Sequence, residues 1–355
     1  MTQHQLTMLN LGQSLDDLAN LDPRGYGVCK ILYKASREYT GQPLCMNAAG
    51  KLVSTLKEGD FVYIMTGFVL PQFKQAETDG IISSVLLCRA LVIAFGVKPI
   101  IICPKENLKA VENLAACVGL HLFEDFEQLR EIPVSMGVVV FTKDAAEAPK
   151  QADEILAAAP PKAVISIECP GANEKGVYHN ATGLDVTELE AKQDVLFEKA
   201  QKMGILNIAI GDLGNEIGMG TIAPQLEKYI PYAGGGRCRC GCEGGLAVKT
   251  KTDNIITATV SDWGCYSLIA ALAFLVGNID VMHTAELEKE AVVTACRSGM
   301  IDMYGWQIPA IDGFGLEINM PIVSLMREMV VQSLKLKDTC KTWFEKVEEL
   351  KFFGE

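Results

Sequence analysis

The sequence predicts an α/β protein built on a mostly parallel, doubly wound (Rossmann-like) sheet, with flanking helices and extra helices at both termini. Apolar runs of strand length recur along the chain, and they are continuous rather than alternating, as in strands that are covered on both faces. Helical patterns separate successive runs, which favours βαβ units with right-handed crossovers. The predicted strands are 61–66, 99–103, 137–142, 163–167, 207–210 and 255–260.

The predicted helices fill the gaps between these strands and extend the chain at both ends. The apolar run 81–97 is interrupted by Arg89 and is shorter than a membrane span, so we expect a buried helix there. The other predicted helices are 107–117, 187–203 and 267–276, with two between 14 and 40 broken near 22–25, and two after Met320. We therefore predict a helical segment at 1–45 packed on the main domain, an α/β domain at 46–330 that carries the site, and a C-terminal helix at 331–355.

Composition narrows the class of protein. The chain has 32 Lys and Arg against 44 Asp and Glu, a formal net charge of −12, with no basic stripe, which argues against nucleic acid as a partner. The N-terminus lacks a basic stretch followed by an apolar run, so no signal peptide is predicted. Twelve cysteines without an export signal favour reduced thiols. We expect a cytoplasmic protein that does not bind membranes.

Acidic residues follow four of the predicted strands, close to glycine or proline. Ligands of open parallel sheets bind beyond the carboxyl ends of the strands, so these side chains are expected to share one pocket for a small polar substrate. The acids concerned are Glu77 and Asp79, Glu168, Asp212 and Glu216, and Asp262. Each also has a plainer interpretation. The first pair could cap a helix, and Glu168 could end its strand in a turn.

The segment 211–220 is the most informative of these loops. It holds four glycines in ten residues, which costs backbone entropy and favours close approach of the backbone to a ligand. Asp212 and Glu216 would reach that ligand or a cation. The glycine spacing does not match the dinucleotide-binding fingerprint.

Further candidates lie outside these loops. The segment 312–317 is another acid-glycine loop, expected to close over the same cleft. Trp263 would either stack on a ligand or belong to the core. Arg24 and Arg237, both beside glycine, are candidate carboxylate clamps or surface side chains.

Three closely spaced cysteines, Cys238, Cys240 and Cys242, allow three interpretations: a metal site, a loop with incidental thiols, or a redox-sensitive pair. Neighbouring cysteines are one residue apart, closer than in typical structural zinc sites, and no histidine is near them in sequence. The histidine nearest to a motif, His179, is expected on a solvated loop.

These motifs, in this order, resemble the D-glutamate cyclase-like C-terminal domain family. The resemblance runs from Asp22 to about Arg327, and its most specific part is 212–220. The matching segments are 22–25, 66–68, 77–80, 167–171, 176–180, 211–220, 261–264 and 312–316. The chain departs from the family pattern at Asp262, where the family usually has Asn, and at Cys169, where it often has Arg.

The resemblance implies a lyase that closes D-glutamate, or a related small acidic amino acid, to 5-oxo-D-proline with loss of water. We expect Asp212 and Glu216 to be the central acid/base or cation-binding pair, with Glu77 and Asp79, then Glu168, as further catalytic groups. The backbone N–H groups of 214–220 would donate to a carboxylate. The predicted substrate-binding residues are Arg24, Thr78, Gly214, Asn215, Gly218, Gly220, Ser261, Asp262, Trp263 and Asp312. A divalent cation, Mg²⁺ or Mn²⁺, is left open as a cofactor, with Asp212 and Glu216 as its ligands.

Three other functions stay open on sequence alone. One is a non-catalytic protein that senses an acidic metabolite in the same cleft. Another is a metal-dependent hydrolase or lyase on a different amino-acid-like substrate. The third is a thiol redox enzyme that uses the cysteines at 238–242. A homo-oligomer is also left open.

Overall fold

The structure is a computed structural model that describes residues 3–335, 345–347 and 349–351. Its centre is a seven-stranded sheet in the order β5-β6-β4-β1-β7-β8-β9, and all neighbouring strands are parallel. The predicted fold class is thereby confirmed. The strands of this sheet are β1 (Phe61–Thr66), β4 (Lys98–Cys103), β5 (His121–Phe123), β6 (Ser135–Val140), β7 (Pro161–Ile167), β8 (Leu206–Gly211) and β9 (Asn254–Thr257).

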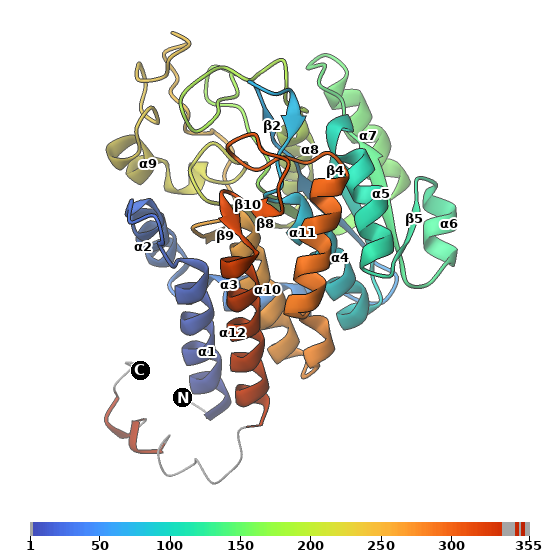
Figure 1. Ribbon diagram of the computed structural model, residues 1–355, viewed down its shortest axis with the longest axis vertical. Coiled ribbons are helices and arrows are strands. Elements are labelled where there is room, and N and C mark those ends of the chain that lie inside the picture. Colours follow the sequence, from blue (N-terminus) through green and yellow to red (C-terminus); the bar gives the residue numbers. More distant parts are fainter. Residues whose placement is uncertain (1–2, 336–344, 348, 352–355) are drawn as a thin grey trace.

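Helices cover both faces of the sheet (Figure 1). Successive strand side chains point to opposite faces, so Ile64 of β1 packs into one core while Tyr63 and Met65 pack into the other. The first face carries α3 (Leu44–Thr55), α4 (Ile81–Phe95), α5 (Leu108–Cys117) and α10 (Ser261–Leu275), with α1 (Gln3–Ala19), α11 (Ala285–Arg297) and α12 (Leu316–Leu334) outside them. The opposite face carries α6 (Phe126–Glu131), α7 (Ala148–Ala158) and α8 (Gln193–Lys202), and α2 (Val28–Thr40) and α9 (Ala223–Tyr229) lie near β9.

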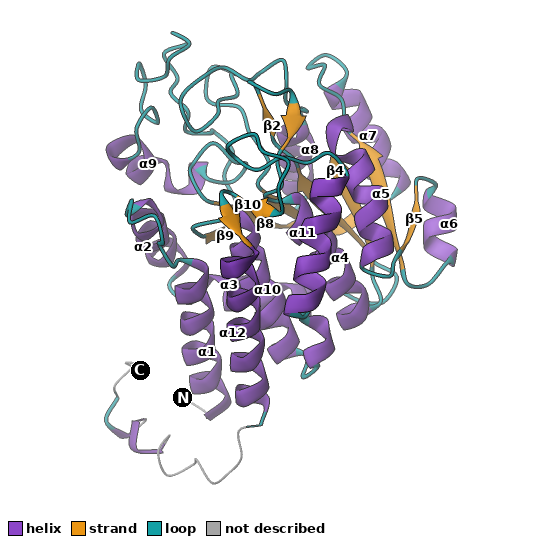
Figure 2. Cartoon of the chain, viewed as in Figure 1, coloured by secondary structure: helices purple, strands orange, loops and turns teal. Residues whose placement is uncertain are grey.

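The chain reverses its direction across the sheet between β1 and β7. After β1 it builds β4, β5 and β6 on one side, then returns to place β7 on the other side of β1 and continues outward to β9. The loops at the carboxyl ends of β1 and β7 diverge at such a point and leave a crevice. Figure 2 shows that much of one end of the molecule is built from loops. Short elements there are β2 (Val69–Leu70) with β3 (Gln75–Ala76), and β10 (Ala310–Ile311) with β11 (Phe314–Gly315).

Several predicted boundaries were wrong. The helix predicted at 187–203 begins only at Gln193, because the preceding residues turn and bury Glu190 and Lys192. The strand predicted at 255–260 ends at Thr257, and α10 begins at Ser261, six residues earlier than predicted. Among other elements, α3 and the short edge strand β5 were not predicted. Apolar runs alone do not distinguish buried strands from buried helices at their ends.

The division of the chain at residues 45 and 330 stays a prediction. Leu11, Leu15 and Ala19 of α1 belong to the same apolar cluster as strand residues such as Ile64. The predicted break between the first two helices is present between Ala19 and Val28. Most of the C-terminal helix predicted at 331–355 lies outside the described residues. Within the described part of the chain, no helix is both long and apolar enough to span a bilayer.

Candidate active site

A cavity of about 310 Å³ lies at the carboxyl edge of the sheet, where the loops after β1, β7, β8 and β9 meet. That volume is at the lower end of the range for small-molecule sites. The lining contains seven of the residues predicted for the site: Arg24, Glu77, Asp79, Glu168, Asp212, Asn215 and Asp312. The predicted convergence of distant acids on one pocket is therefore present in the fold.

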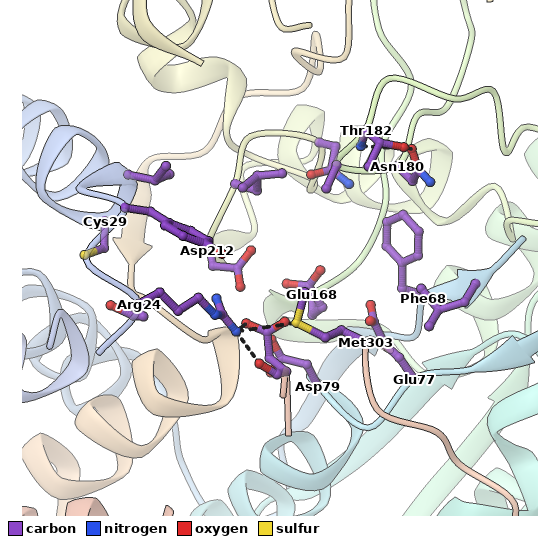
Figure 3. Close-up of a pocket in the computed structure, with 18 of the residues that line it drawn as sticks. Arg24, Cys29, Phe68, Glu77, Asp79, Glu168, Asn180, Thr182, Asp212 and Met303 are labelled. Atoms are coloured by element: carbon purple, nitrogen blue, oxygen red, sulfur yellow. Dashed lines mark hydrogen bonds and ion pairs between the residues drawn. The ribbon is translucent and has the colours of Figure 1, made fainter. Parts of the chain in front are cut away.

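Besides Asp22 from the turn between α1 and α2, five carboxyl groups from four loops line this cavity, and Figure 3 shows Glu77, Asp79, Glu168 and Asp212 drawn around it. They are Glu77 and Asp79 after β1, Glu168 after β7, Asp212 after β8, and Asp312 from the β10–β11 turn. Carboxylate oxygens of Asp79, Asp212 and Asp312 lie within 4.8 Å of one another, and so do those of Glu168, Asp212 and Glu216. Such a concentration of like charge in a buried pocket needs protons or cations to be stable.

The two helices beside the pocket exchange caps. Asp262, at the start of α10, accepts hydrogen bonds from the backbone N–H groups of Gly80 (2.8 Å) and Ser83 (3.3 Å) at the start of α4. In return, Asp79 accepts from the N–H groups of Ser261 (3.1 Å) and Asp262 (2.9 Å). Each carboxylate thus satisfies backbone donors at the positive end of the neighbouring helix. This exchange fixes Asp79 at the pocket wall and places Asp262 beneath it, fully buried.

Glu168 is held in an unusual backbone conformation at the end of β7. Its φ is +44°, a region that costs a non-glycine residue energy. Ser261 donates a 2.6 Å hydrogen bond from its hydroxyl to the Glu168 Oε2. Gly80, with φ +82°, lies alongside, and a Cβ there would be 2.6 Å from the Glu168 Cβ. The local structure therefore supports one orientation of the Glu168 carboxyl group at the cavity.

Glu216 does not line the cavity, although it was predicted as half of the central catalytic pair. Its Oε1 accepts hydrogen bonds from the N–H groups of Asp212 (3.0 Å) and Leu213 (2.9 Å), and its Oε2 accepts from Gly214 (2.6 Å). The side chain is fully buried, and these bonds close the loop that presents Asp212. Glu216 therefore stabilises the loop that carries Asp212.

The glycine-rich segment 211–220 packs against protein, and two of the N–H groups predicted to bind a substrate carboxylate already have protein acceptors. The N–H of Gly214 donates to Glu216 and that of Gly220 donates to the Thr250 carbonyl (3.0 Å). A Cβ on Gly220 would meet three backbone oxygens at 2.7–2.9 Å, and one on Gly218 would lie 2.3 Å from the Ala209 Cβ. These glycines permit close packing of the loop. Of the site residues predicted after Asp212 in this loop, only Asn215 lines the cavity.

Arg24 brings a positive charge to the pocket. It forms an ion pair with Asp312, with 2.7 Å between Nη2 and Oδ2, and also donates to the Asp312 backbone carbonyl. Its guanidinium lies 4.5 Å from the centre of the Phe314 ring. Of the two predicted clamps, Arg24 therefore lines the cavity, whereas Arg237 lies on an exposed loop and donates to the Glu227 carbonyl.

Four other predicted substrate-binding residues lie behind the pocket wall. Thr78 donates from its hydroxyl to the Ala310 carbonyl. Trp263 is fully buried, and its Nε1 donates to Asn319 (2.8 Å). It therefore belongs to the core, the second of the two places expected for it. Ser261 and Asp262 contact Glu168 and the start of α4, as described above. These residues support the site from beneath, and among the described residues none of the four lines the cavity.

The surroundings raise the pKa of five of the pocket acids. Burial, followed by repulsion from neighbouring carboxylates, raises the pKa of Glu77, Asp79, Glu168 and Asp212 well above their usual range. Burial raises the pKa of Asp312 to about 6, although Arg24 opposes that shift. The raised pKa values favour the protonated forms of these groups, so they can donate as well as accept protons.

Sequence reasoning missed part of the lining and one buried acid. Phe68, Asn180 and Thr182 line the cavity, and the only signal for Asn180 was the 176–180 segment of the family resemblance. Glu190 is fully buried below the β2 segment, where its Oε1 accepts from the Val69 N–H (3.0 Å). Burial raises its pKa to about 8. Nothing in the surrounding sequence marks Glu190 as buried.

His179 is also placed differently from the prediction. It was expected on a solvated loop, but only 1% of its surface is exposed. Its ring faces the thiols of 238–242, which are sixty residues away in the sequence.

Comparison with known proteins agrees with this geometry. The family model described as "D-glutamate cyclase-like, C-terminal" matches residues 15–327. The chain belongs to this family. The mitochondrial D-glutamate cyclase of Homo sapiens is 32% identical to it over 113 residues, which is 32% of this chain and 17% of the human protein. The chain therefore matches only a small part of that relative's length.

Close packing in the 211–220 loop of this D-glutamate cyclase-like protein can be tested with two alanine variants. Gly218→Ala is destabilised both by the strained φ of +92° and by the clash with Ala209, whereas Gly204→Ala is destabilised only by its φ of +74°, because its Cβ would meet open space. We expect losses in unfolding free energy of about 3 kcal/mol or more for Gly218→Ala and about 1 kcal/mol for Gly204→Ala. Urea denaturation measures both, and equal losses would contradict the packing role.

The buried carboxyl of Glu190 makes stability depend on pH. Its pKa is about 8 in the folded protein against 4.5 as the ordinary value, so the folded state binds the proton more tightly, and stability falls as pH rises through this window. Glu190→Gln removes the ionisation and should gain stability over the original protein, on the order of 2–4 kcal/mol at pH 9, with no such gain at pH 4.5. Thermal unfolding across this pH range measures it. The exposed Glu188→Gln is the control, and parallel curves for all three proteins would refute the prediction.

Proposed function

We propose that this protein is a lyase that converts D-glutamate, or a closely related acidic amino acid, to 5-oxo-D-proline and water. The observation that carries the proposal is the pair formed by Glu168 and Asp212, two carboxyl groups within 4.8 Å of each other in a pocket with one arginine. Family membership and the name of the human relative support the same reaction.

The reaction moves protons without net change in the protein. The substrate ammonium loses two protons, and the nitrogen bonds to the side-chain carboxyl carbon. One oxygen leaves that carbon and departs with both protons as water. The protein must therefore accept a proton near the nitrogen and supply one near the departing oxygen. An anionic carboxylate resists attack, so a proton donor at this carboxyl group is essential.

Glu168 and Asp212 suit this exchange because burial raises the pKa of both, and repulsion from Glu168 raises the pKa of Asp212 further. When one of two close carboxyl groups keeps its proton, the other ionises more readily, which separates an acid from a base. We assign Asp212 to accept the ammonium proton, and Glu168, oriented by Ser261, to donate to the departing oxygen. Glu77 and Asp79 extend the acidic wall and are assigned to hold the ammonium group before it reacts.

Arg24 is assigned to the substrate's other carboxylate. The guanidinium has five N–H donors, and its bonds to Asp312 use Nη2. A pocket that holds both ends of the substrate keeps it curled, and much of the rate advantage of a ring closure comes from that positioning. Phe68, Leu70 and Val28 supply apolar walls for the methylene groups.

A divalent cation is the one cofactor that these residues fit. Asp79, Asp212 and Asp312 offer hard oxygen ligands within 4.8 Å of one another, as Mg²⁺ and Mn²⁺ prefer. When bound, the cation would polarise the substrate carboxyl group. Glu216, predicted as a ligand, does not line the cavity, so we assign the site to the three aspartates, which do.

The reaction is tested by incubating the purified protein with D-glutamate and, separately, with L-glutamate, and following 5-oxoproline by chiral chromatography. We expect lactam from D-glutamate only. A protein that gains thermal stability from D-glutamate but forms no lactam would be a sensor of that metabolite, and the lyase proposal would be wrong.

Removing either member of the central pair should abolish most of the activity. We expect Asp212→Asn and Glu168→Gln each to lower kcat by about 100-fold or more, because proton transfer contributes a factor of that order. Thermal unfolding establishes that the variants fold, and Glu174→Gln, an exposed acid outside the cavity, should keep full activity. Full turnover in a folded Asp212→Asn protein would remove Asp212 from the mechanism.

Cation binding is measured on chelator-treated protein. Added Mg²⁺ or Mn²⁺ should raise the melting temperature, because the cation relieves repulsion among the aspartates. Asp312→Asn should reduce this shift, and Glu174→Gln should keep it. If neither ion changes the melting temperature of the original protein at millimolar concentration, the cation has no place in the site.

A further inference from the structure

The structure assembles a second set of potential metal ligands, separate from the acidic pocket. The Sγ atoms of Cys238, Cys240 and Cys242 and a ring nitrogen of His179 all lie within 4.8 Å of one another. The cysteines belong to an irregular segment between α9 and β9, drawn in gold in Figure 1, and the histidine belongs to the loop after β7. Because the cysteine segment and the histidine are far apart in sequence, only the fold brings these four side chains together.

The distances within this cluster fit the ligands of one tetrahedral ion. Cys238 Sγ lies 3.6 Å from Cys240 Sγ and 3.5 Å from Cys242 Sγ. His179 Nε2 lies 3.2 Å from Cys240 Sγ and 3.6 Å from Cys242 Sγ. Tetrahedral zinc, with bonds of about 2.3 Å to sulfur and about 2.0 Å to nitrogen, places its ligands about 3.8 Å (S to S) and about 3.5 Å (S to N) apart. A disulfide would instead require about 2.05 Å between sulfurs.

The buried imidazole is a second, independent observation. Only 1% of the His179 surface is exposed, and its Nε2 contacts the sulfurs of Cys240 and Cys242. A buried polar ring with such weak partners costs stability. Coordination through Nε2 would replace these weak contacts with a strong interaction.

Two neighbouring groups donate hydrogen bonds to the sulfur of Cys242. The backbone N–H of Gly244 and the side-chain amide of Asn173 both donate to the Cys242 Sγ, each at 3.4 Å. Hydrogen bonds of this kind orient metal-bound thiolates and stabilise their charge. Three thiolates and one Zn²⁺ carry a net charge of −1, and Arg237 and Arg239 flank Cys238 in the sequence with positive charge.

We propose that Cys238, Cys240, Cys242 and His179 Nε2 bind one structural Zn²⁺. Three residues separate Cys238 from Cys242, which is within the usual spacing of a zinc-binding pair, and Cys240 is the third sulfur ligand. All four tetrahedral positions are then filled by protein, which is the arrangement of a structural site rather than a catalytic one. Soft thiolates with one imidazole select zinc over magnesium or calcium.

The ion would tie the cysteine segment to a wall of the acidic pocket. His179 precedes Asn180, which lines the cavity, and the His179 carbonyl accepts from Asn215, another lining residue (3.1 Å). The Arg239 N–H donates to the Gly183 carbonyl (2.8 Å), so the two loops already touch beside the cluster. Bound zinc would cross-link the loop that carries His179 to the segment that carries the cysteines, and neither has helix or strand at that point.

The first test measures metal content and coordination. Protein purified under reducing conditions without chelator should hold about one zinc per chain by mass spectrometry of the metal. Protein refolded with Co²⁺ should show the intense visible bands of tetrahedral cobalt and the near-ultraviolet bands of thiolate-to-cobalt charge transfer. Protein that binds less than about a tenth of an equivalent after incubation with zinc, or a cobalt spectrum without thiolate bands, would overturn the proposal.

Variants identify the ligands. Cys238→Ser, Cys242→Ser and His179→Ala should each reduce zinc content about tenfold or more after dialysis. Cys296→Ser, which changes a partly exposed thiol outside the cluster, and Asp212→Asn, which changes the acidic pocket, should both keep the zinc. Zinc lost from Asp212→Asn but kept in Cys242→Ser would place the ion in the acidic pocket and refute the cysteine site.

Hydrogen exchange on the original protein provides a test that does not depend on the folding of variants. Removing zinc should increase exchange in 176–184 and 236–245 together, while β1 keeps its protection. Unchanged exchange in both segments would refute the cross-link. A disulfide detected between these cysteines in freshly reduced and purified protein would favour a redox pair instead.

Discussion

The exchange of carboxylates between α4 and α10 is the constraint on which the pocket depends. The backbone N–H groups at a helix start need acceptors, and here each helix takes them from the other through Asp79 and Asp262. The two helix starts are therefore locked side by side at the carboxyl edge of the sheet. Ser261 lies within this junction and holds Glu168, so the helix junction and the candidate chemistry share the same few residues.

Burial of so many acids stores electrostatic free energy in this region. Repulsion and desolvation oppose ionisation, and the pocket relieves them through protonation and through the ion pair of Arg24 with Asp312. Strain is stored in the same place, since both Glu168 and Asp312 have positive φ. Catalytic pockets typically contain such destabilising groups, because the perturbed pKa values that catalysis uses lower the stability of the folded protein.

Much of the site follows from the sequence because parallel strands bring their ends to one edge. Glu77, Asp79, Glu168 and Asp212 were predicted together on this ground, and all four line the cavity. The sequence does not indicate which way a loop side chain points. Glu216 is acidic like the residues that line the cavity, but its carboxylate turns away from the cavity and accepts hydrogen bonds from backbone N–H groups. Other features depend on tertiary packing alone. The residues around His179 do not predict its contact with cysteines about sixty residues away, and no local pattern predicts that Glu190 is buried.

The position of Arg24 has a consequence for the molecule as a whole. The sheet begins only at β1, yet the guanidinium that balances Asp312 comes from the turn between α1 and α2. The segment that joins α1 and α2 therefore contributes to the charge balance of the pocket. A fragment reduced to the sheet and its later helices would retain Glu77, Asp79, Glu168, Asp212 and Asp312 but lose this counter-charge, so the smallest unit that holds the complete pocket is larger than the smallest unit that holds the sheet.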